Sequence, residues 1–184
     1  RSGMPDMTGR SVKDNARLYR EKYGPDYDFY GIREKRIAFT RQYIREHGLP
    51  VKPGLRELVK YLRVHGYRWA MATSSSREAA ERNLGLTGML DDFPCRICGD
   101  MVERSKPDPQ IFLRAAAEIG TIPAETVVLE DSYNGIRAAY AGGFIACMVP
   151  DLRGPDEEIS ALLTRRFDTL ADVILFLEEN TARE

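Results

Sequence analysis

The sequence lacks any apolar run long enough to cross a bilayer, which predicts a protein with no membrane-spanning segment. It also lacks an excess of charge: 27 Lys and Arg stand against 28 Asp and Glu, so nothing global indicates nucleic-acid binding. Cysteine is scarce, and an odd count of three fits the reducing cytoplasm. What is present, 43% hydrophobic and 30% charged residues over 184 positions, is typical of a globular chain with a sizeable core.

Cys95 and Cys98 form a single C-x-x-C motif, which is half of a zinc site. Zinc needs two further ligands at a suitable spacing, and the sequence offers no second pair. Free cysteine also behaves as a small hydrophobic residue. We therefore interpret residues 94–98 as a short buried strand.

The hydrophobic pattern changes at residues 50–53, which we interpret as a boundary between two parts. Residues 11–47 have helical periodicity, with a break near Gly24. Beyond the boundary, strands are expected at 67–72, 94–98, 126–130, 143–149 and 166–167, and helices at 53–66, 76–84, 109–119, 132–141 and 170–177. This alternation predicts an α/β fold, in which a Rossmann-like parallel sheet is flanked by helices.

Two adjacent carboxylates, Glu130 and Asp131, follow an apolar strand and precede a predicted helix. Ligands of open α/β sheets bind at the carboxyl ends of the strands. Neighbouring carboxylates repel each other unless a cation compensates them, and Mg²⁺ is the hard ion that oxygen ligands prefer. Helix capping by Asp131 or Ser132 explains one acidic residue at most. The pair therefore predicts a magnesium site.

Three hydroxyl side chains, Thr73, Ser74 and Ser75, follow another predicted strand. Hydroxyls and backbone N–H groups at a strand-to-helix turn suit a phosphate group. An ordinary turn is the alternative, since Ser75 and Glu78 have the spacing of a capping box.

Lys106 lies on a predicted loop that enters a helix, because Asp108 and Pro109 have the pattern of an N-cap followed by Pro at N1. A single Lys is commonly a solvated surface residue. Held rigidly near the strand ends, it offers a point charge to a phosphoryl oxygen.

Hydroxyls, a lysine and an acidic pair follow successive predicted strands in that chain order. This order resembles the haloacid dehalogenase-like (HAD) hydrolase superfamily, in its phosphatase and β-phosphoglucomutase-like branch. The matching motifs lie at 72–75, 105–109 and 129–135, with further similarity at 99–100 and 148–151. The resemblance implies a core domain at residues 51–184 and part of a helical cap at residues 1–50.

The resemblance implies a Mg²⁺-dependent phosphoric monoester hydrolase that acts on a small phosphorylated metabolite, such as a sugar phosphate, through an aspartyl-phosphate. The implied site comprises phosphate-binding Thr73, Ser74, Ser75 and Lys106, of which Thr73 and Lys106 are catalytic, the metal ligands Glu130 and Asp131, and supporting Asn134. β-Phosphoglucomutase is an alternative, although Val12 stands where the mutase pattern places an Arg. A non-catalytic binding protein on the same scaffold is a further alternative. A haloacid dehalogenase is disfavoured, because its chemistry has no need of a metal.

The first motif of the family, an apolar strand followed by Asp-x-Asp-Gly-Thr, is absent from the sequence. Asp6 is the nearest candidate nucleophile, but no apolar strand precedes it and Thr8 stands where the second Asp belongs. In the family this strand lies in the middle of the sheet, so its loss leaves backbone groups unpaired. We therefore expect a longer protein, of which the 184-residue chain is an inactive part without the first strand.

Overall fold

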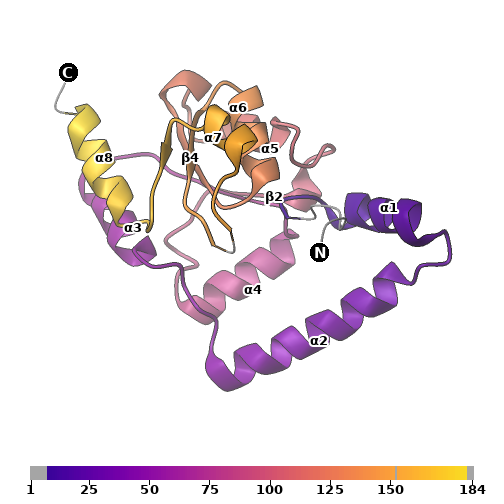
Figure 1. Cartoon of the computed structure of the whole chain (residues 1–184). Coiled ribbons are helices and arrows are strands. Elements are labelled where there is room, and N and C mark those ends of the chain that lie inside the picture. The colour runs from indigo at the N-terminus through magenta and orange to yellow at the C-terminus, as the bar shows by residue number, and fades with distance from the viewer. Residues whose placement is uncertain (1–7, 152, 182–184) are drawn as a thin grey trace.

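A parallel α/β core forms most of the structure, a computed structural model that describes residues 8–151 and 153–181 (Figure 1). The strands lie in two sheets. One pairs β1 (Met71–Thr73) with β2 (Arg96–Cys98), and the other has the order β3 (Val127–Glu130), β4 (Ile145–Met148), β5 (Arg165–Arg166). Every pairing is parallel, which confirms the predicted α/β fold class.

The helices of the core alternate with the strands along the chain, as the hydrophobic pattern predicted. They are α3 (Leu55–Val64), α4 (Arg77–Thr87), α5 (Gln110–Glu118), α6 (Tyr133–Ala141), α7 (Glu157–Leu162) and α8 (Asp172–Thr181), with 3-10 turns η1 (Gly99–Met101) and η2 (Pro123–Glu125). Ser76, Ser132 and Asp156 begin α4, α6 and α7, because each side chain accepts a hydrogen bond from a backbone N–H of the first turn.

Several elements differ at their ends from the sequence expectations, and the differences at β1 and α7 have a structural reason. β1 begins at Met71 rather than at residue 67, because its partner β2 offers three residues for pairing. Trp69 and Ala70 pack against core clusters outside the paired strand, so burial extends the strand-like pattern beyond the pairing. α7 was not predicted, since six residues are too few for a recognisable period, but its fully buried Ile159 packs in one cluster with residues of α6.

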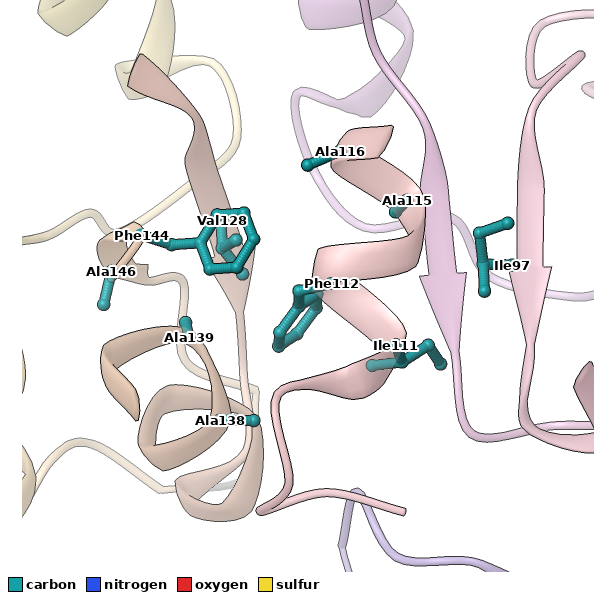
Figure 2. Packing of buried hydrophobic residues seen from close by; sticks show 10 residues of the cluster. All are labelled: Ile97, Ile111, Phe112, Ala115, Ala116, Val128, Ala138, Ala139, Phe144 and Ala146. Atoms are coloured by element: carbon teal, nitrogen blue, oxygen red, sulfur yellow. The ribbon is translucent and has the colours of Figure 1, made fainter. Parts of the chain in front are cut away.

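One cluster of buried apolar side chains joins the two sheets through α5 (Figure 2). Ile111 and Phe112 of α5 lie between Val128 of β3 and Ile97 of β2 in this view. Phe112 also meets Phe144 edge-on, with ring centroids 6.0 Å apart. Burying a large apolar side chain contributes about 1.5–3 kcal/mol, so α5 stabilises the arrangement of the two sheets.

β1 and β3 each have one unpaired edge within residues 8–151 and 153–181. There, β1 pairs only with β2, and β3 pairs only with β4. Both strands nevertheless contribute to the same cluster, through Ala72 of β1 and Val128 of β3. These two edges therefore face the same buried cluster without a strand pairing between them in the described residues.

A helical arm precedes the core and consists of α1 (Val12–Tyr23) and α2 (Phe29–His47) (Figure 1). Gly24, with φ at +102°, ends α1 and confirms the predicted break. Tyr19 and Phe29 join the two helices, with ring centroids 5.6 Å apart. In the described part of the chain, no helix has the length and apolar character needed to cross a membrane.

Candidate active site

A buried ion pair lies at the carboxyl end of β3. Lys106 is 4% exposed, and its Nζ donates to Oε1 of Glu130, the last residue of the strand. Oε2 of Glu130 accepts a hydrogen bond of 2.9 Å from Ser132 Oγ. The Lys106 ammonium also lies 4.6 Å from the centroid of the Phe112 ring. Burial rules out a solvated surface lysine at this position.

The residues after β3, Ser132 and Gly135, contact the Glu130 carboxylate. A Cβ built on Gly135 would lie 2.1 Å from Oε2 of Glu130, so only glycine leaves room for the side chain. Ser132 is the N-cap of α6, accepting from the Gly135 N–H at 3.0 Å. Because Ser132 performs the capping, capping does not explain Asp131.

Asp131 is the more open of the two carboxylates. Its side chain is 43% exposed and lies 3.6 Å from Lys52 Nζ. Glu130, in contrast, is 9% exposed and already engaged by Lys106. No group of three His, Cys, Asp or Glu side chains within the described residues could hold a metal ion. Within the described residues, Glu130 and Asp131 are thus two adjacent carboxylates without a third acidic, His or Cys side chain that could complete a metal site.

The hydroxyl residues Thr73, Ser74 and Ser75, which we call the hydroxyl loop, lie at the carboxyl end of β1. Thr73 Oγ1 accepts from the Ser75 N–H at 3.2 Å, and Ser74 Oγ donates to the Gly9 carbonyl at 2.6 Å. The N-cap of α4 is Ser76, so the predicted capping role of Ser75 is wrong by one residue. The Ser75 side chain is exposed and is not needed to cap the helix.

The loop of residues 105–109, which we call the lysine loop, leads into α5, and this helix begins one residue later than predicted. Pro109 is the N-cap and α5 starts at Gln110, while Asp108 Oδ1 accepts from the Gln110 N–H at 2.9 Å. The carboxylate still satisfies a free N–H of the first turn, as the pattern indicated. The prediction that Asp108 accepts a hydrogen bond from the first turn is confirmed, but the N-cap is Pro109 rather than Asp108.

The backbone of Thr8 and Gly9, which we expected in the helical cap, contacts the segments that follow β1 and β3. The Thr8 carbonyl accepts from Asn134 Nδ2 at 2.8 Å, and the Gly9 carbonyl accepts from Ser74. Gly9 has φ at +81°, and a Cβ there would lie 2.8 Å from Ser132 Oγ. The carboxyl ends of β1 and β3 therefore meet around this backbone. Asp6, rejected above as a nucleophile, lies outside the described residues.

Asp14 connects α1 to the lysine loop, and sequence patterns did not reveal it. Its Oδ2 accepts from Ser11 Oγ at 2.7 Å and from Ser105 Oγ at 2.5 Å. Hydrogen bonds from Ser105, and then from Ser11, lower the pKa of Asp14 below its usual value. Because Ser105 precedes Lys106, this carboxylate ties the arm to the loop that carries the buried lysine.

We expect the contact between α1 and the Ser105 loop to weaken at low pH. Since the pKa of Asp14 is lowered by folding, its contribution to stability is present above the unfolded value of 3.8 and is lost as the pH falls through the folded value. Asp14→Ala should therefore raise amide hydrogen exchange in α1 at neutral pH, while Asp26→Ala, an exposed control, should not. Equal exchange in both variants would contradict a role for this contact.

The chain has a Rossmann-like α/β fold, and polar groups gather around a buried lysine–carboxylate pair at the carboxyl ends of its parallel strands. Proteins of this fold bind their ligands at that edge of the sheet. The chain belongs to the haloacid dehalogenase-like hydrolase family, which matches residues 5–143. The resemblance drawn from the three motifs is thereby confirmed.

Several relatives carry phosphatase names. The bifunctional riboflavin kinase/FMN phosphatase of Arabidopsis thaliana is 35% identical over 63% of this chain and 33% of that protein. The phosphorylated carbohydrates phosphatase of Thermotoga maritima is 30% identical over 60% of this chain and 51% of that protein. The match thus spans between a third and a half of each relative. These names agree with the predicted class, a phosphoric monoester hydrolase.

A comparison with solved structures supports the α/β fold. The crystal structure of CbbY from Rhodobacter sphaeroides in complex with phosphate has a TM-score of 0.75 and 25% identity, covering 91% of this chain and 76% of that one.

Proposed function

We propose that the protein is a Mg²⁺-dependent phosphatase that hydrolyses a small phosphomonoester, such as a sugar phosphate. The observation that carries the proposal is the buried pair of Lys106 and Glu130 at the carboxyl end of β3, beside the hydroxyl loop. A phosphatase of phosphorylated carbohydrates among the relatives supports this substrate class.

Phosphoryl transfer depends on positioning and on neutralising charge rather than on covalent chemistry by many groups. In this proposal Lys106 supplies a fixed positive charge to the transferring phosphoryl group. Thr73, Ser74 and Ser75 bind phosphoryl oxygens through hydroxyl and N–H donors, and Asn134 holds the crossing segment through the Thr8 carbonyl. The exposed loop after β1 leaves these donors near solvent.

Glu130 and Asp131 are the residues that would hold Mg²⁺. When bound, the ion supplies further charge neutralisation to the phosphate. Asp131 is open enough to reach a cation, while Glu130 is oriented by Lys106 and Ser132. The remaining ligands belong to residues outside the described part.

The nucleophilic Asp, in our proposal, lies on a strand outside residues 8–181. The unpaired edges of β1 and β3 support this, because one parallel strand between them would join the two sheets. Its carboxyl end would lie where Ser74 and Asn134 contact the Thr8–Gly9 backbone. Residues 1–50 would then form part of a cap over that site.

A phosphomonoester screen with Mg²⁺ on the N-terminally extended protein tests the function. We expect release of inorganic phosphate from a sugar phosphate and loss of this activity in EDTA. An isomerised sugar phosphate without phosphate release would identify β-phosphoglucomutase instead. Phosphate release that survives EDTA would contradict the Mg²⁺ dependence, and halide release from a haloacid in EDTA would identify dehalogenase chemistry. No turnover of any substrate would favour a non-catalytic binding protein.

A further inference from the structure

A groove of about 560 Å³ lies along β2, and it shares no lining residue with the candidate active site. Its volume falls within the range of small-molecule sites, about 300–1,000 Å³. Four of its lining residues are arginines from four separate segments: Arg68, Arg77, Arg96 and Arg114. Glu118 is the single carboxylate among the lining residues within the described part. We call this feature the arginine groove.

Two of the arginines are anchored without being neutralised. Arg68 Nη1 donates to the Gly120 carbonyl at 2.5 Å, and Arg114 Nη1 donates to the Met101 carbonyl. A carbonyl is a neutral acceptor, so each contact fixes the guanidinium and leaves its positive charge. Within residues 8–151 and 153–181, neither side chain forms an ion pair with a carboxylate. A guanidinium has five N–H donors, so most of them remain for a ligand.

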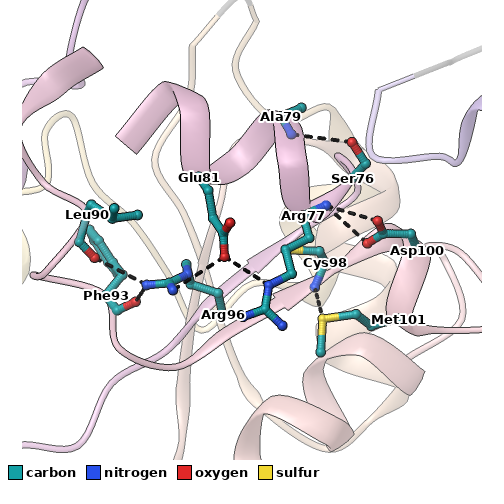
Figure 3. A network of polar contacts seen from close by, with 10 residues as sticks. All are labelled: Ser76, Arg77, Ala79, Glu81, Leu90, Phe93, Arg96, Cys98, Asp100 and Met101. Carbon is teal, nitrogen blue, oxygen red and sulfur yellow. Dashed lines mark hydrogen bonds and ion pairs between the residues drawn. The ribbon is translucent and has the colours of Figure 1, made fainter. Parts of the chain in front are cut away.

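The other two arginines share one carboxylate, as Figure 3 shows. Glu81 Oε1 lies 2.9 Å from Arg77 Nε and 3.5 Å from Arg96 Nη2. The opposite side of the Arg96 guanidinium donates to the Leu90 and Phe93 carbonyls. Arg96 Nε is buried and has no hydrogen-bond partner within the described residues. One carboxylate thus faces two guanidinium groups, and the local charge stays positive.

We propose that the arginine groove binds a small organic anion that carries at least two phosphate groups. Like charges held side by side repel each other, and an anion that lies between them relieves this cost. Guanidinium groups match phosphate oxygens with paired hydrogen bonds. Trp69 and Ile119, which are partly exposed, add apolar surface to the same groove for the organic part of the ligand. β2 pairs over three residues, so its free edge is short for adding a peptide strand.

The arginine groove lies close in the chain to the hydroxyl loop of the proposed active site. Arg77 directly follows the N-cap of α4, and its backbone N–H donates to Asp100 at 3.1 Å. The neighbouring Gly99 N–H donates to the Ser75 carbonyl at 2.8 Å. Arg77, which lines the groove, thus follows the hydroxyl loop by two residues in the chain.

Trp69 is the only tryptophan of the chain and lines the groove, so its fluorescence reports on occupancy. The probe is pyrophosphate, titrated in EDTA at constant ionic strength. We expect a saturable change, with affinity weakened about tenfold or more in Arg68→Gln and Arg114→Gln, which is about 1.4 kcal/mol or more. Both arginines are exposed, so folding should survive, and Arg114→Lys should bind more tightly than Arg114→Gln.

Ser74→Ala is the control for binding at the catalytic edge and should keep the wild-type affinity. The proposal is overturned if pyrophosphate gives no saturable change, or if the two Gln variants bind as tightly as wild type. It is also overturned if Ser74→Ala abolishes the response, or if a hexaglutamate peptide binds where pyrophosphate does not.

Discussion

Lys106→Met will lower the free energy of unfolding by about 3–5 kcal/mol, because removing one partner of a buried ion pair leaves an uncompensated charge. The Glu130 carboxylate is 9% exposed, and Ser132 would remain as its side-chain donor. Urea unfolding of the wild type and the variant measures the difference. In the N-terminally extended protein, the same substitution will abolish phosphate release.

The double variant Lys106→Met/Glu130→Gln separates stability from activity. A neutral Gln needs no cation, so we expect it to recover most of the lost stability while phosphate release stays absent. With the Glu130→Gln single variant added, the wild type, the two single variants and the double variant form a double-mutant cycle, which gives the coupling energy of the pair. A Lys106→Met variant that is as stable as wild type, or that still releases phosphate, would contradict the role assigned to this pair.

Asp131→Asn will cause a large loss of function with only a small loss of stability, in contrast to Lys106→Met, which loses both. Its contact with Lys52 is exposed, and exposed pairs contribute about 0–1 kcal/mol. If Asp131 binds Mg²⁺ directly, removing its charge should weaken metal affinity by about 100-fold or more. Substituting a residue that only hydrogen-bonds to a metal ligand already lowers metal affinity by about 10–100-fold. The Mg²⁺ concentration for half-maximal phosphate release in the extended protein measures this affinity.

Asp91→Asn is the matched control, because Asp91 is exposed and lies outside the site. It should leave both the Mg²⁺ requirement and the unfolding transition unchanged. An Asp131→Asn protein with the wild-type Mg²⁺ requirement would show that Asp131 does not bind the ion.

Local patterns predicted the parts of the fold that depend on neighbours in sequence. The strand that ends at Glu130 was expected at 126–130 and lies at Val127–Glu130. Its position was predictable because an apolar run is followed directly by charged residues. The helix after it was expected at 132–141 and lies at Tyr133–Ala141, beginning at the polar cap Ser132. The interpretation of residues 94–98 as a buried strand holds in part: Cys98 is buried in β2, whereas Cys95 lies just before the strand and is partly buried.

Contacts between distant segments could not be predicted in this way. Ser105 and Asp14 are 91 positions apart, and neither residue type is unusual in its own segment. Thr8 contributes a backbone carbonyl to Asn134, and a backbone contact leaves no trace in side-chain chemistry. The arginine groove likewise draws on four segments that only the folded sheet brings together.

The most direct test compares phosphate release by two proteins under the same conditions, with a sugar phosphate and Mg²⁺. One is the 184-residue chain, with its 20.9 kDa mass verified by intact mass spectrometry, and the other is the N-terminally extended protein. We predict that the extended protein releases phosphate and that the 184-residue chain does not, because our proposal puts the nucleophile on a further strand between β1 and β3. Turnover by the folded 20.9 kDa chain alone would contradict this account.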